Sequence, residues 1–598
     1  MKEFFKYFLA TIAGLFVTLI LVTLIFVGII GAAISGGDDK EAKVKDNTVL
    51  HIKLDGPIAE RGSKNPFEDF DPFNMEASKS MGLNEILENI EKAKEDDRIK
   101  GIFLDISIVQ GGMATVEEIR NALIDFKESG KFIISYSEIF SQKAYYLASV
   151  SDQINVNPAG ILEFKGLGTQ MMFFKKALEK LEVEMQIIRG TNNKFKSAVE
   201  PFMYEKMSPA NREQVQKFLD AMWNHMLAGI SKERNVSVEE LNRIADGMLI
   251  RDGDDAVEYK LADKSAYYDE VMTEIRTRLE IEEDKDINMI ALSKYSSAKS
   301  KNKLDIDMES KFKKDKIAIV YAYGEIQGGK NKKGVMGSES IAEAIKEARK
   351  DSTVKAVVLR VNSPGGSALA SDVMWREIIL TKKVKPVIVS MGDVAASGGY
   401  YISCAADKIY AQPNTITGSI GVFGTLPNAK GLFENKLGIT MDTVNTNRHS
   451  DIMNLMRPLT PEEYSIIQQG VDKIYDDFIT KVADGRKMTK EMVDSIGQGR
   501  VWAGTDALTI GLVDEIGGIE DAIEYAAELA KLGEDYAIKS LPKQKDPFEE
   551  FMLELSGEME AKIISNKLGD NYRYIQVIEE IVSRKGYMAR MPYDVVVY

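Results

Sequence analysis

One serine stands out in the stretch "SMGDVAASGGYYISCAADKIY", residues 390–410. Ser397 follows the apolar, strand-like run "KPVIVS" and lies between two alanines and two glycines, where a helix is expected to begin. With only small neighbours at a strand-to-helix turn, its hydroxyl can be approached closely by another molecule. A serine hydroxyl is a poor nucleophile at neutral pH, however, and needs an adjacent base.

Two side chains are candidates for that base. His449 lies in "NTNRHSDIM", a polar stretch typical of a solvated loop. Lys196 lies in "GTNNKFKSAVEPF", where small and apolar residues follow it. A lysine can act as a base when burial lowers its pKa enough for the neutral amine to exist near pH 7. From residue types alone, both candidates stay open.

The chain contains the same unit twice, in an ungapped register with an offset of 255 residues. A shared α/β composition would give scattered matches, but not this many in one register. The matching pairs are Gly82/Gly337, Ile86/Ile341, Ile90/Ile345, Ala93/Ala348, Asp96/Asp351, Lys100/Lys355, Leu104/Leu359, Gly111/Gly366, Ile133/Ile388, Ser135/Ser390, Tyr145/Tyr400, Tyr146/Tyr401, Asp152/Asp407 and Pro158/Pro413.

The two copies differ where chemistry is expected. Gln142 stands opposite Ser397, and Lys143 stands opposite Gly398. Where the first copy has "IVQGG", the second has "NSPGGS", a Gly-rich turn that lets backbone N–H groups approach a ligand. The N–H of Gly398 and an N–H of the Gly365-Gly366 turn are therefore the candidate donors of an oxyanion hole.

The candidate lysine lies in the other copy. Lys196 belongs to the first copy, and the corresponding region of the second, "NTNRHSDIMNLM", contains no lysine. Each copy thus retains a different half of a possible Ser/Lys pair. This division favours a catalytic role for Lys196 over that of an ordinary surface lysine.

Apolar runs such as "AVVLRV" and "PVIVSM" alternate with amphipathic helical runs such as "SIAEAIKEARKD" in each copy. This alternation predicts βαβ units, a largely parallel sheet and the α/β fold class. We expect a first repeat over residues 47–280, a linker over 281–314, a second repeat over 315–540 and a helical C-terminal tail over 541–598.

Composition limits the partners and cofactors. A formal net charge of −15 over 598 residues argues against nucleic-acid binding, which needs basic surfaces. One cysteine and three scattered histidines argue against an intramolecular disulfide framework and a zinc site. No metal and no cofactor are expected.

The N-terminus carries an apolar segment from Tyr7 to Ser35 without one charge, long enough to cross a bilayer. A cleaved signal peptide is the alternative, but its apolar core would span only about 7–15 residues. Lys2 and Lys6 before the segment predict a cytoplasmic N-terminus. The rest of the chain would then lie outside the cytoplasm, anchored to the cell inner membrane by one transmembrane helix.

The motifs "GDVAASGGYY", "NSPGG", "TGSIGVFG" and "KFKSAVEPF" together resemble the long form of the signal peptide peptidase A (protease IV) family. The resemblance covers nearly the whole chain after the apolar segment. It implies two tandem crotonase-like or Clp-protease-like domains, Ser397 as nucleophile, Lys196 as general base and Ser419 as a hydrogen-bond partner of that lysine. It also implies a homotetramer that degrades signal-peptide remnants.

Two alternatives stay open. Crotonase-like folds support several chemistries, so a non-catalytic or acyl-CoA-binding membrane scaffold is the first. An esterase that pairs Ser397 with His449 is the second.

Overall fold

The structure is a computed structural model, and it describes residues 42–63, 70–71, 76–77, 81–282, 285–298, 315–533, 535–544 and 586–591, with isolated residues before these. Most of the apolar segment Tyr7–Ser35 lies outside the described residues. Among the residues that are described, no helix has the length and apolar character needed to cross a membrane.

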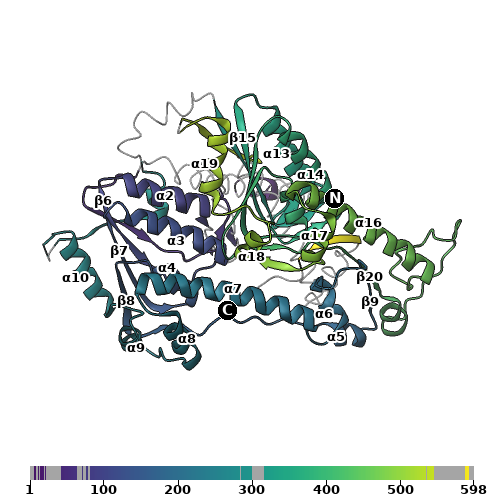
Figure 1. Cartoon of the computed structure of the whole chain (residues 1–598), viewed down its shortest axis with the longest axis horizontal. Helices are drawn as coiled ribbons and strands as arrows, with labels where there is room; N and C mark the ends of the chain where they lie inside the picture. The colour runs from purple at the N-terminus through teal and green to yellow at the C-terminus, as the bar shows by residue number, and fades with distance from the viewer. Residues whose placement is uncertain are drawn as a thin grey trace.

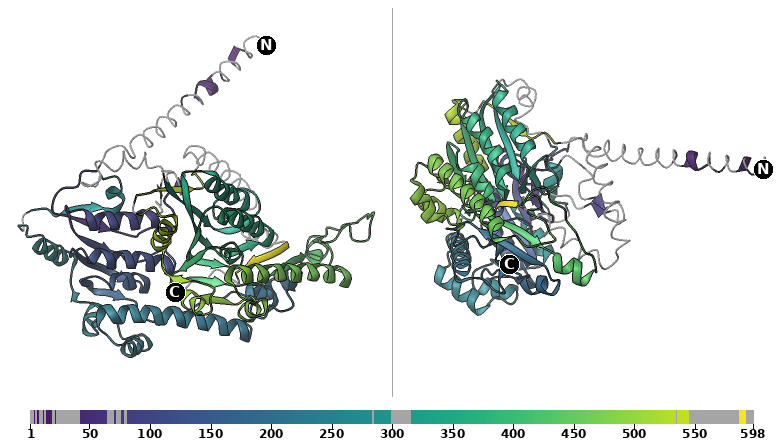
Figure 2. Two further views of the ribbon diagram at one scale, coloured as in Figure 1. Left: turned by 45° about the horizontal axis from the view of Figure 1, so that its top comes forward. Right: turned by 90° about the vertical axis from the view of Figure 1, so that its right-hand side faces the viewer.

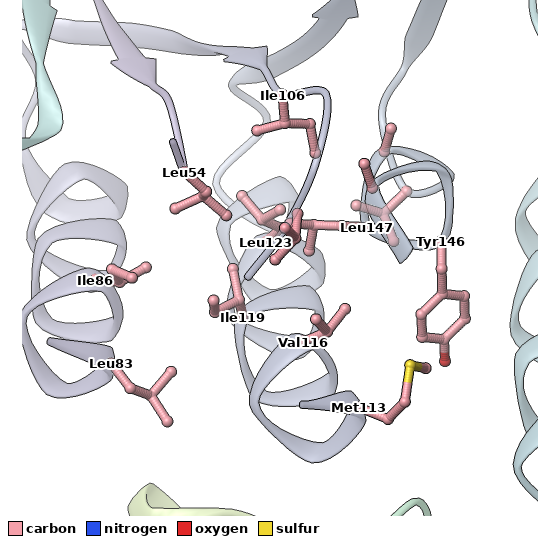
Figure 3. Packing of buried hydrophobic residues seen from close by; sticks show 14 of the residues in the cluster. Leu54, Leu83, Ile86, Ile106, Met113, Val116, Ile119, Leu123, Tyr146 and Leu147 are labelled. Carbon is pink, nitrogen blue, oxygen red and sulfur yellow. The ribbon is translucent and has the colours of Figure 1, made fainter. Parts of the chain in front are cut away.

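The first repeat is built on a parallel sheet of six described strands, in the order β10-β8-β7-β6-β1-β11. Helices α2 and α3 pack on the sheet through apolar side chains such as Ile86, Val116 and Ile119 (Figure 3). The strands are β1 (Thr48–Ile52), β6 (Ile99–Asp105), β7 (Phe132–Phe140), β8 (Gln153–Leu162), β10 (Lys264–Ser265) and β11 (Asn288–Ala291), and the helices named in the argument are α2 (Leu83–Glu95), α3 (Met113–Lys127) and α4 (Gln142–Ala148).

The second repeat has the corresponding sheet, in the order β21-β19-β17-β15-β12-β23, with β18 beside β17 and β22 beside β18. Its pairs are parallel except β19 with β21. The strands are β12 (Lys316–Tyr323), β15 (Val354–Ser363), β17 (Val387–Ala396), β18 (Lys408–Ala411), β19 (Ile416–Gly418), β21 (Val501–Ala503), β22 (Glu515–Ile516) and β23 (Ala537–Leu541), and the main helices are α13 (Ser338–Lys350), α14 (Ala368–Lys382), α15 (Gly398–Ser403), α16 (Pro461–Arg486) and α19 (Ile519–Ala530).

The predicted α/β class with largely parallel sheets is confirmed, and two segments differ from their expected form. Strand β11 and helix α11 (Leu292–Tyr295) lie within the stretch expected to be a linker, yet β11 pairs with β1 and extends the first sheet. Most of the C-terminal tail, expected to be helical, lies outside the described residues, but its described end forms strand β24 (Gly586–Arg590). Both segments gain backbone hydrogen bonds from distant strands, which local sequence patterns do not reveal.

A third sheet joins the repeats, in the order β14-β13-β16-β24-β20-β9. Strand β9 (Glu184–Arg189) comes from the first repeat and pairs antiparallel with β20 (Phe423–Asn428) of the second. The other strands are β13 (Glu325–Gln327), β14 (Val335–Gly337) and β16 (Gly365–Ser367). Helix α7 (Pro209–Arg234) runs beneath both repeats, which lie side by side (Figures 1 and 2). The first repeat therefore extends a strand and a long helix across to the second.

Candidate active site

Ser397 stands between strand β17 and helix α15, as the sequence predicts. Its backbone has φ 55° and ψ −110°, a conformation that L-residues with side chains rarely adopt. Such a residue costs about 1–3 kcal/mol and persists only where its surroundings hold it. Here the Ser397 N–H donates to the carbonyl of Gly418 at 2.8 Å, and its carbonyl accepts the Tyr401 N–H at 2.8 Å. The strained turn presents the hydroxyl beside the end of β19.

Lys196 reaches the same place from the other repeat. It follows β9, whose pairing with β20 carries the chain onto the second repeat. The Phe195 N–H donates to the Gln498 carbonyl at 2.9 Å, and the Gln214 side chain on α7 donates to the Phe195 carbonyl at 3.1 Å. Contacts from both repeats, one to a backbone carbonyl and one from a side chain, therefore fix the loop that carries the lysine.

The two side chains are in hydrogen-bonding contact. Lys196 Nζ lies 2.8 Å from Ser397 Oγ, 3.0 Å from Ser419 Oγ and 3.1 Å from the Ser419 carbonyl oxygen. All three residues are fully buried. Ser419 itself has φ 49°, which turns both its hydroxyl and its carbonyl toward the amine. The structure thus brings together Lys196, Ser397 and Ser419, the three side chains that the sequence analysis assigned to the site.

Burial sets the electrostatics of this contact. Desolvation lowers the pKa of Lys196 well below the ordinary value of a lysine, because the charged ammonium loses its water shell. The neutral amine has a lone pair that can accept the proton of the Ser397 hydroxyl. The site therefore meets the condition that the sequence analysis set for a lysine base.

Three glycines next to Ser397 provide backbone donors. Gly398 is the first residue of α15, and Gly365 and Gly366 have φ values of 96° and 154°. The Gly365 N–H already donates to Ser363 Oγ at 3.2 Å. The Gly365 N–H is thus held by its own turn, whereas Gly366 faces the added strand β24, so Gly366 and Gly398 are the better candidates for the two oxyanion donors.

A peptide strand of the same chain lies across these glycines. Strand β24 pairs antiparallel with β16, with Gly366 opposite Ala589, and on its other edge with β20. The Met591 N–H donates to the Pro364 carbonyl, so these two residues form a hydrogen-bonded pair. Hydrogen-bonded and non-hydrogen-bonded pairs alternate along an antiparallel ladder. The Gly366–Ala589 pair, two positions along, is therefore also hydrogen-bonded. A Cβ added to Gly365 would lie 2.2 Å from the Ala589 carbonyl oxygen and 2.7 Å from the Gly398 nitrogen. Only glycine allows that carbonyl to come so near the oxyanion donors.

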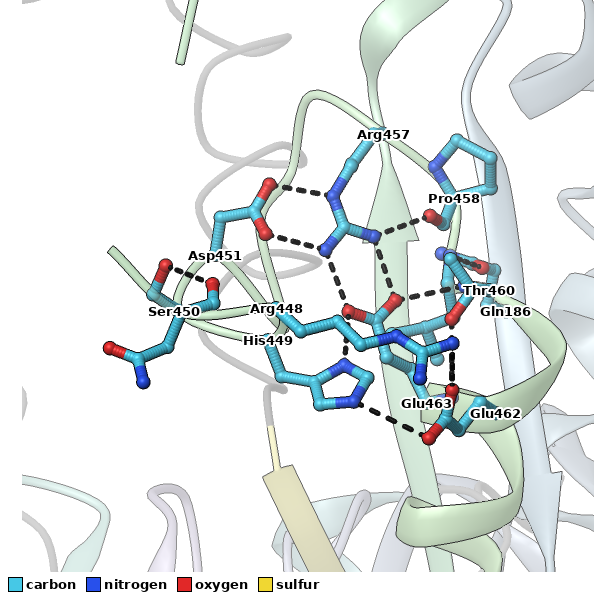
Figure 4. A network of polar contacts seen from close by, with 12 residues as sticks. Gln186, Arg448, His449, Ser450, Asp451, Arg457, Pro458, Thr460, Glu462 and Glu463 are labelled. Atoms are coloured by element: carbon cyan, nitrogen blue, oxygen red, sulfur yellow. Dashed lines mark hydrogen bonds and ion pairs between the residues drawn. The ribbon is translucent and has the colours of Figure 1, made fainter. Parts of the chain in front are cut away.

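His449 is engaged elsewhere. Its ring lies 3.3 Å from Glu463 and 3.6 Å from Glu462, at the start of α16, within a network around Arg457 (Figure 4). The base that contacts Ser397 in this structure is Lys196. The pairing of Ser397 with His449 receives no support from the geometry.

In the first repeat the corresponding turn is filled by its own side chains. Gln142 accepts the backbone N–H groups of Lys165 and Gly166 at 2.9 and 3.0 Å. Lys143 donates to the Gly111 carbonyl at 3.0 Å, at the turn that corresponds to Gly366. Hydrogen bonds that hold a loop thus replace the serine and its backbone donors.

Sequence reasoning missed two features next to the site. The strand β24 was not expected there, because the tail carries a helical pattern and its partner strands are more than 150 positions away in the sequence. Asp393, four residues before Ser397, contacts the first repeat, and only the Asp itself in "MGDVAAS" could have drawn attention to it.

Comparison with known proteins identifies the family of the chain. The model of peptidase family S49 matches residues 125–282 and 379–533, one segment in each repeat. Protease 4 of Salmonella typhi is 38% identical over 460 residues, which cover 75% of this chain and 72% of that protein. Protease 4 of Haemophilus influenzae is 33% identical and covers 92% of this chain and 88% of that protein.

A chloroplast relative extends the comparison. The chloroplastic serine protease SPPA of Arabidopsis thaliana is 33% identical over 565 residues, which cover 92% of this chain and 78% of that protein. These relatives match both repeats together rather than one. The chain belongs to peptidase family S49 and is a serine protease.

Proposed function

We propose that the chain is a membrane-anchored serine endopeptidase that uses a Ser397/Lys196 dyad to degrade cleaved signal peptides and other apolar peptides outside the cytoplasm. The observation that carries the dyad is the 2.8 Å contact between a fully buried lysine amine and the hydroxyl of a strained serine. Each group comes from a different repeat, so both repeats are needed to form the site.

The reaction follows from the contacts. Neutral Lys196 accepts the proton of Ser397 as its oxygen attacks the peptide carbonyl, and the ammonium then protonates the leaving amine. The N–H groups of Gly366 and Gly398 stabilise the developing oxyanion; loss of one such donor costs about 3–4 kcal/mol of barrier. Water then hydrolyses the acyl-enzyme, with Lys196 as base again. Ser419 accepts from the amine and holds it toward Ser397.

The pairing of strand β24 is the argument that the peptide substrate binds in extended form. Its backbone adds a strand between β16 and β20, the mode by which sheet edges bind peptides. Met588 packs with Phe423, Val199 and Ala198 in an apolar cluster next to the site. We infer that substrate residues before the scissile bond occupy the same place, which favours apolar peptides.

The membrane part of the proposal rests on the uncharged segment Tyr7–Ser35, which would form a single-pass anchor in the cell inner membrane. The N-terminus would be cytoplasmic and both repeats extracytoplasmic, in the periplasm of a cell with two membranes. The likeness of each repeat to crotonase-like or Clp-protease-like domains is likewise a proposal from the motifs. Protease protection in spheroplasts tests the topology: degradation of the folded repeats by added protease is expected, and full protection would contradict it.

Exposed apolar residues support a homotetramer in which copies of the chain meet head to tail. Leu369 and Val373 on α14 are 75% and 43% exposed, whereas their counterparts on α3, Ala114 and Glu118, are buried, and Glu118 accepts a hydrogen bond from Arg360 of the second repeat. A second copy of the chain could cover this face of α14.

The complementary face lies on the first repeat. Ile108 and Ile139 are 63% and 50% exposed, whereas their counterparts in the second repeat, Ser363 and Val394, are buried and half-buried. Repeating the internal contact between chains would cover both faces. Native mass spectrometry tests this: Leu369→Asp is expected to yield smaller assemblies, and an unchanged tetramer, or a wild-type monomer, would contradict it.

Cleavage of an apolar fluorogenic peptide by the full chain in detergent tests the dyad. Activity is expected in the wild type and in His449→Ala, and loss is expected in Ser397→Ala and Lys196→Ala. Survival of activity in Lys196→Ala would overturn the dyad. The acyl-CoA-binding or scaffold alternative receives no support from the family model or from the relatives that match most of the chain, which are peptidases. An inactive wild type would revive it.

A further inference from the structure

The strand that carries Ser397 is irregular just before the serine. Val361 of β15 pairs with Met391 of β17, and the next paired residues are Ser363 and Ala395. Between these two pairs the chain advances by two residues on β15 but by four on β17. The extra residues form a bulge over 392–394. Because regular pairing resumes only at Ala395, the shape of this bulge sets the position of Ser397 along the strand.

The first repeat holds this bulge. Asp393 accepts the Thr115 N–H at 2.9 Å and the Thr115 hydroxyl at 2.7 Å. Thr115 is the third residue of α3, whose N-cap Gly112 offers no side-chain cap. A Cβ added to Gly112 would lie 2.1 Å from the Asp393 carboxyl carbon, so the glycine makes room for the incoming aspartate. Asp393 therefore caps a helix of the opposite repeat.

The second repeat shows what an ordinary cap looks like at the same place. Ser367 is the counterpart of Gly112, and Ala370 is the counterpart of Thr115. There, Ser367 caps its own helix α14 by accepting the Ala370 N–H at 3.3 Å. The first repeat has Gly112 at that position, and Asp393 of the second repeat caps the helix instead, across the interface.

A second contact supports the bulge from the other side. The Val394 N–H donates to the Asn362 side-chain oxygen at 3.1 Å, and the Asn362 amide donates to Glu60 of the first repeat at 2.5 Å. Glu60 also pairs with the fully buried Arg360 at 2.6 Å. The bulge thus lies between two groups of contacts that both depend on the first repeat.

We propose that Asp393 is a positioning residue: by capping α3 in the first repeat it fixes the bulge before the nucleophile, and so sets the place of the Ser397 hydroxyl relative to Lys196 and the oxyanion donors. The inference rests on the proposed role of Ser397. It assigns the first repeat a second contribution to the site, besides Lys196.

The experiment compares Asp393→Ala, Asp393→Asn and Asp393→Ala combined with Gly112→Ser, each in the full chain. Three quantities are measured: kcat and KM for a fluorogenic peptide, the rate of Ser397 labelling by a fluorophosphonate probe, and Tm. Asp393→Ala is expected to lower kcat and the labelling rate about 10- to 100-fold, since a misplacement near 1 Å can cost that much, with KM within about twofold. Asp393→Asn keeps an acceptor for the Thr115 N–H and is expected to stay within about threefold of wild type.

The double variant separates positioning from helix stability. Gly112→Ser supplies α3 with its own cap, as Ser367 does for α14, so Tm is expected to recover while kcat stays low. Recovery of both would show that Asp393 only stabilises the fold and would overturn the proposal, as would an unchanged kcat in Asp393→Ala or an Asp393→Asn as inactive as the alanine variant.

A matched control is Asp252→Ala, which removes the cap of α9 (Gly253–Glu258) within the first repeat. It is expected to lower Tm with kcat unchanged; an equal loss of kcat would mean that any lost cap reduces activity, and would contradict a specific role of Asp393. Ser397→Ala tests the proposed function separately from the role of Asp393. If this variant keeps the peptidase activity, the proposed role of Ser397 is wrong, whatever the Asp393 variants show.

Discussion

The turn at Ser397 and its counterpart at Gln142 follow corresponding strands of two copies of one fold, yet their surroundings are opposite. At Ser397, the hydroxyl meets a lysine amine, and a strand lies along the neighbouring glycines. At Gln142, the side chain holds the backbone of its own loop, and Lys143 covers the corresponding glycine. The first repeat thus lacks the serine, and in the proposed mechanism it contributes to the site of the second repeat through Lys196, β9 and the helix that receives Asp393.

The sharpest contrast is expected between Ser397→Ala and Gln142→Ala. Loss of the nucleophile should lower kcat/KM at least about 10⁴-fold, as for other serine proteases. Gln142→Ala should leave kcat/KM within about twofold and lower the free energy of unfolding by about 1–3 kcal/mol, since two backbone N–H groups lose their acceptor. Peptide cleavage and thermal unfolding measure both. Equal loss of activity in the two variants would contradict the division between repeats.

Lys196→Met should have the next largest effect. The methionine fills a similar volume but cannot accept a proton, so kcat should fall about 10²- to 10⁴-fold. Lys194→Ala is the matched control, because this exposed lysine lies two residues earlier in the same loop, and its kcat should not change. Steady-state kinetics on both variants measure this difference in kcat. A strong loss of kcat in Lys194→Ala would instead indicate that the substitutions disrupt the loop.

Removal of β24 should act in the opposite direction. A chain ending at residue 585 should show a kcat/KM about tenfold higher, because the strand along Gly366 no longer competes with substrate. A chain ending at residue 591 keeps β24 and should behave as wild type. If the shorter chain is folded by Tm yet less active, β24 belongs to the machinery of the site rather than occupying the substrate's place.

Ser419→Ala should cause the smallest loss of activity among the variants of the three site side chains. The Lys196 amine loses one partner at 3.0 Å but keeps the Ser419 carbonyl at 3.1 Å, so kcat should fall about 10-fold, by roughly 1.4 kcal/mol of barrier. Ser403→Ala, which removes a buried hydroxyl bound to the Gly399 carbonyl at 2.7 Å, is the control for losing a buried hydrogen bond. A comparable loss there would remove the special role of Ser419.

The sequence predicted the α/β class, the duplication and the three residues that meet at the site. It could do so because the repeats share one register, so that Ser397 opposite Gln142 showed where the copies diverge. Residue types could not reveal β24, β11 or the contact of Asp393 with Thr115. Each depends on pairing between segments far apart in the chain, and such pairing leaves no local periodicity. Ser419 came from the family motif alone, and the structure supplies its contact with Lys196.

The most direct test of the Ser/Lys dyad is the pH dependence of Ser397 labelling by a fluorophosphonate probe, in wild type and Lys196→Met. Because burial lowers the pKa of Lys196, the amine is neutral above that pKa and protonated below it. Labelling should therefore fall as pH drops through the lowered pKa, and reach its plateau well below pH 10. The account predicts this profile in wild type and its absence, with slow labelling, in Lys196→Met. Equal labelling of both proteins, or a wild-type plateau only near the pKa of an ordinary lysine, would contradict it.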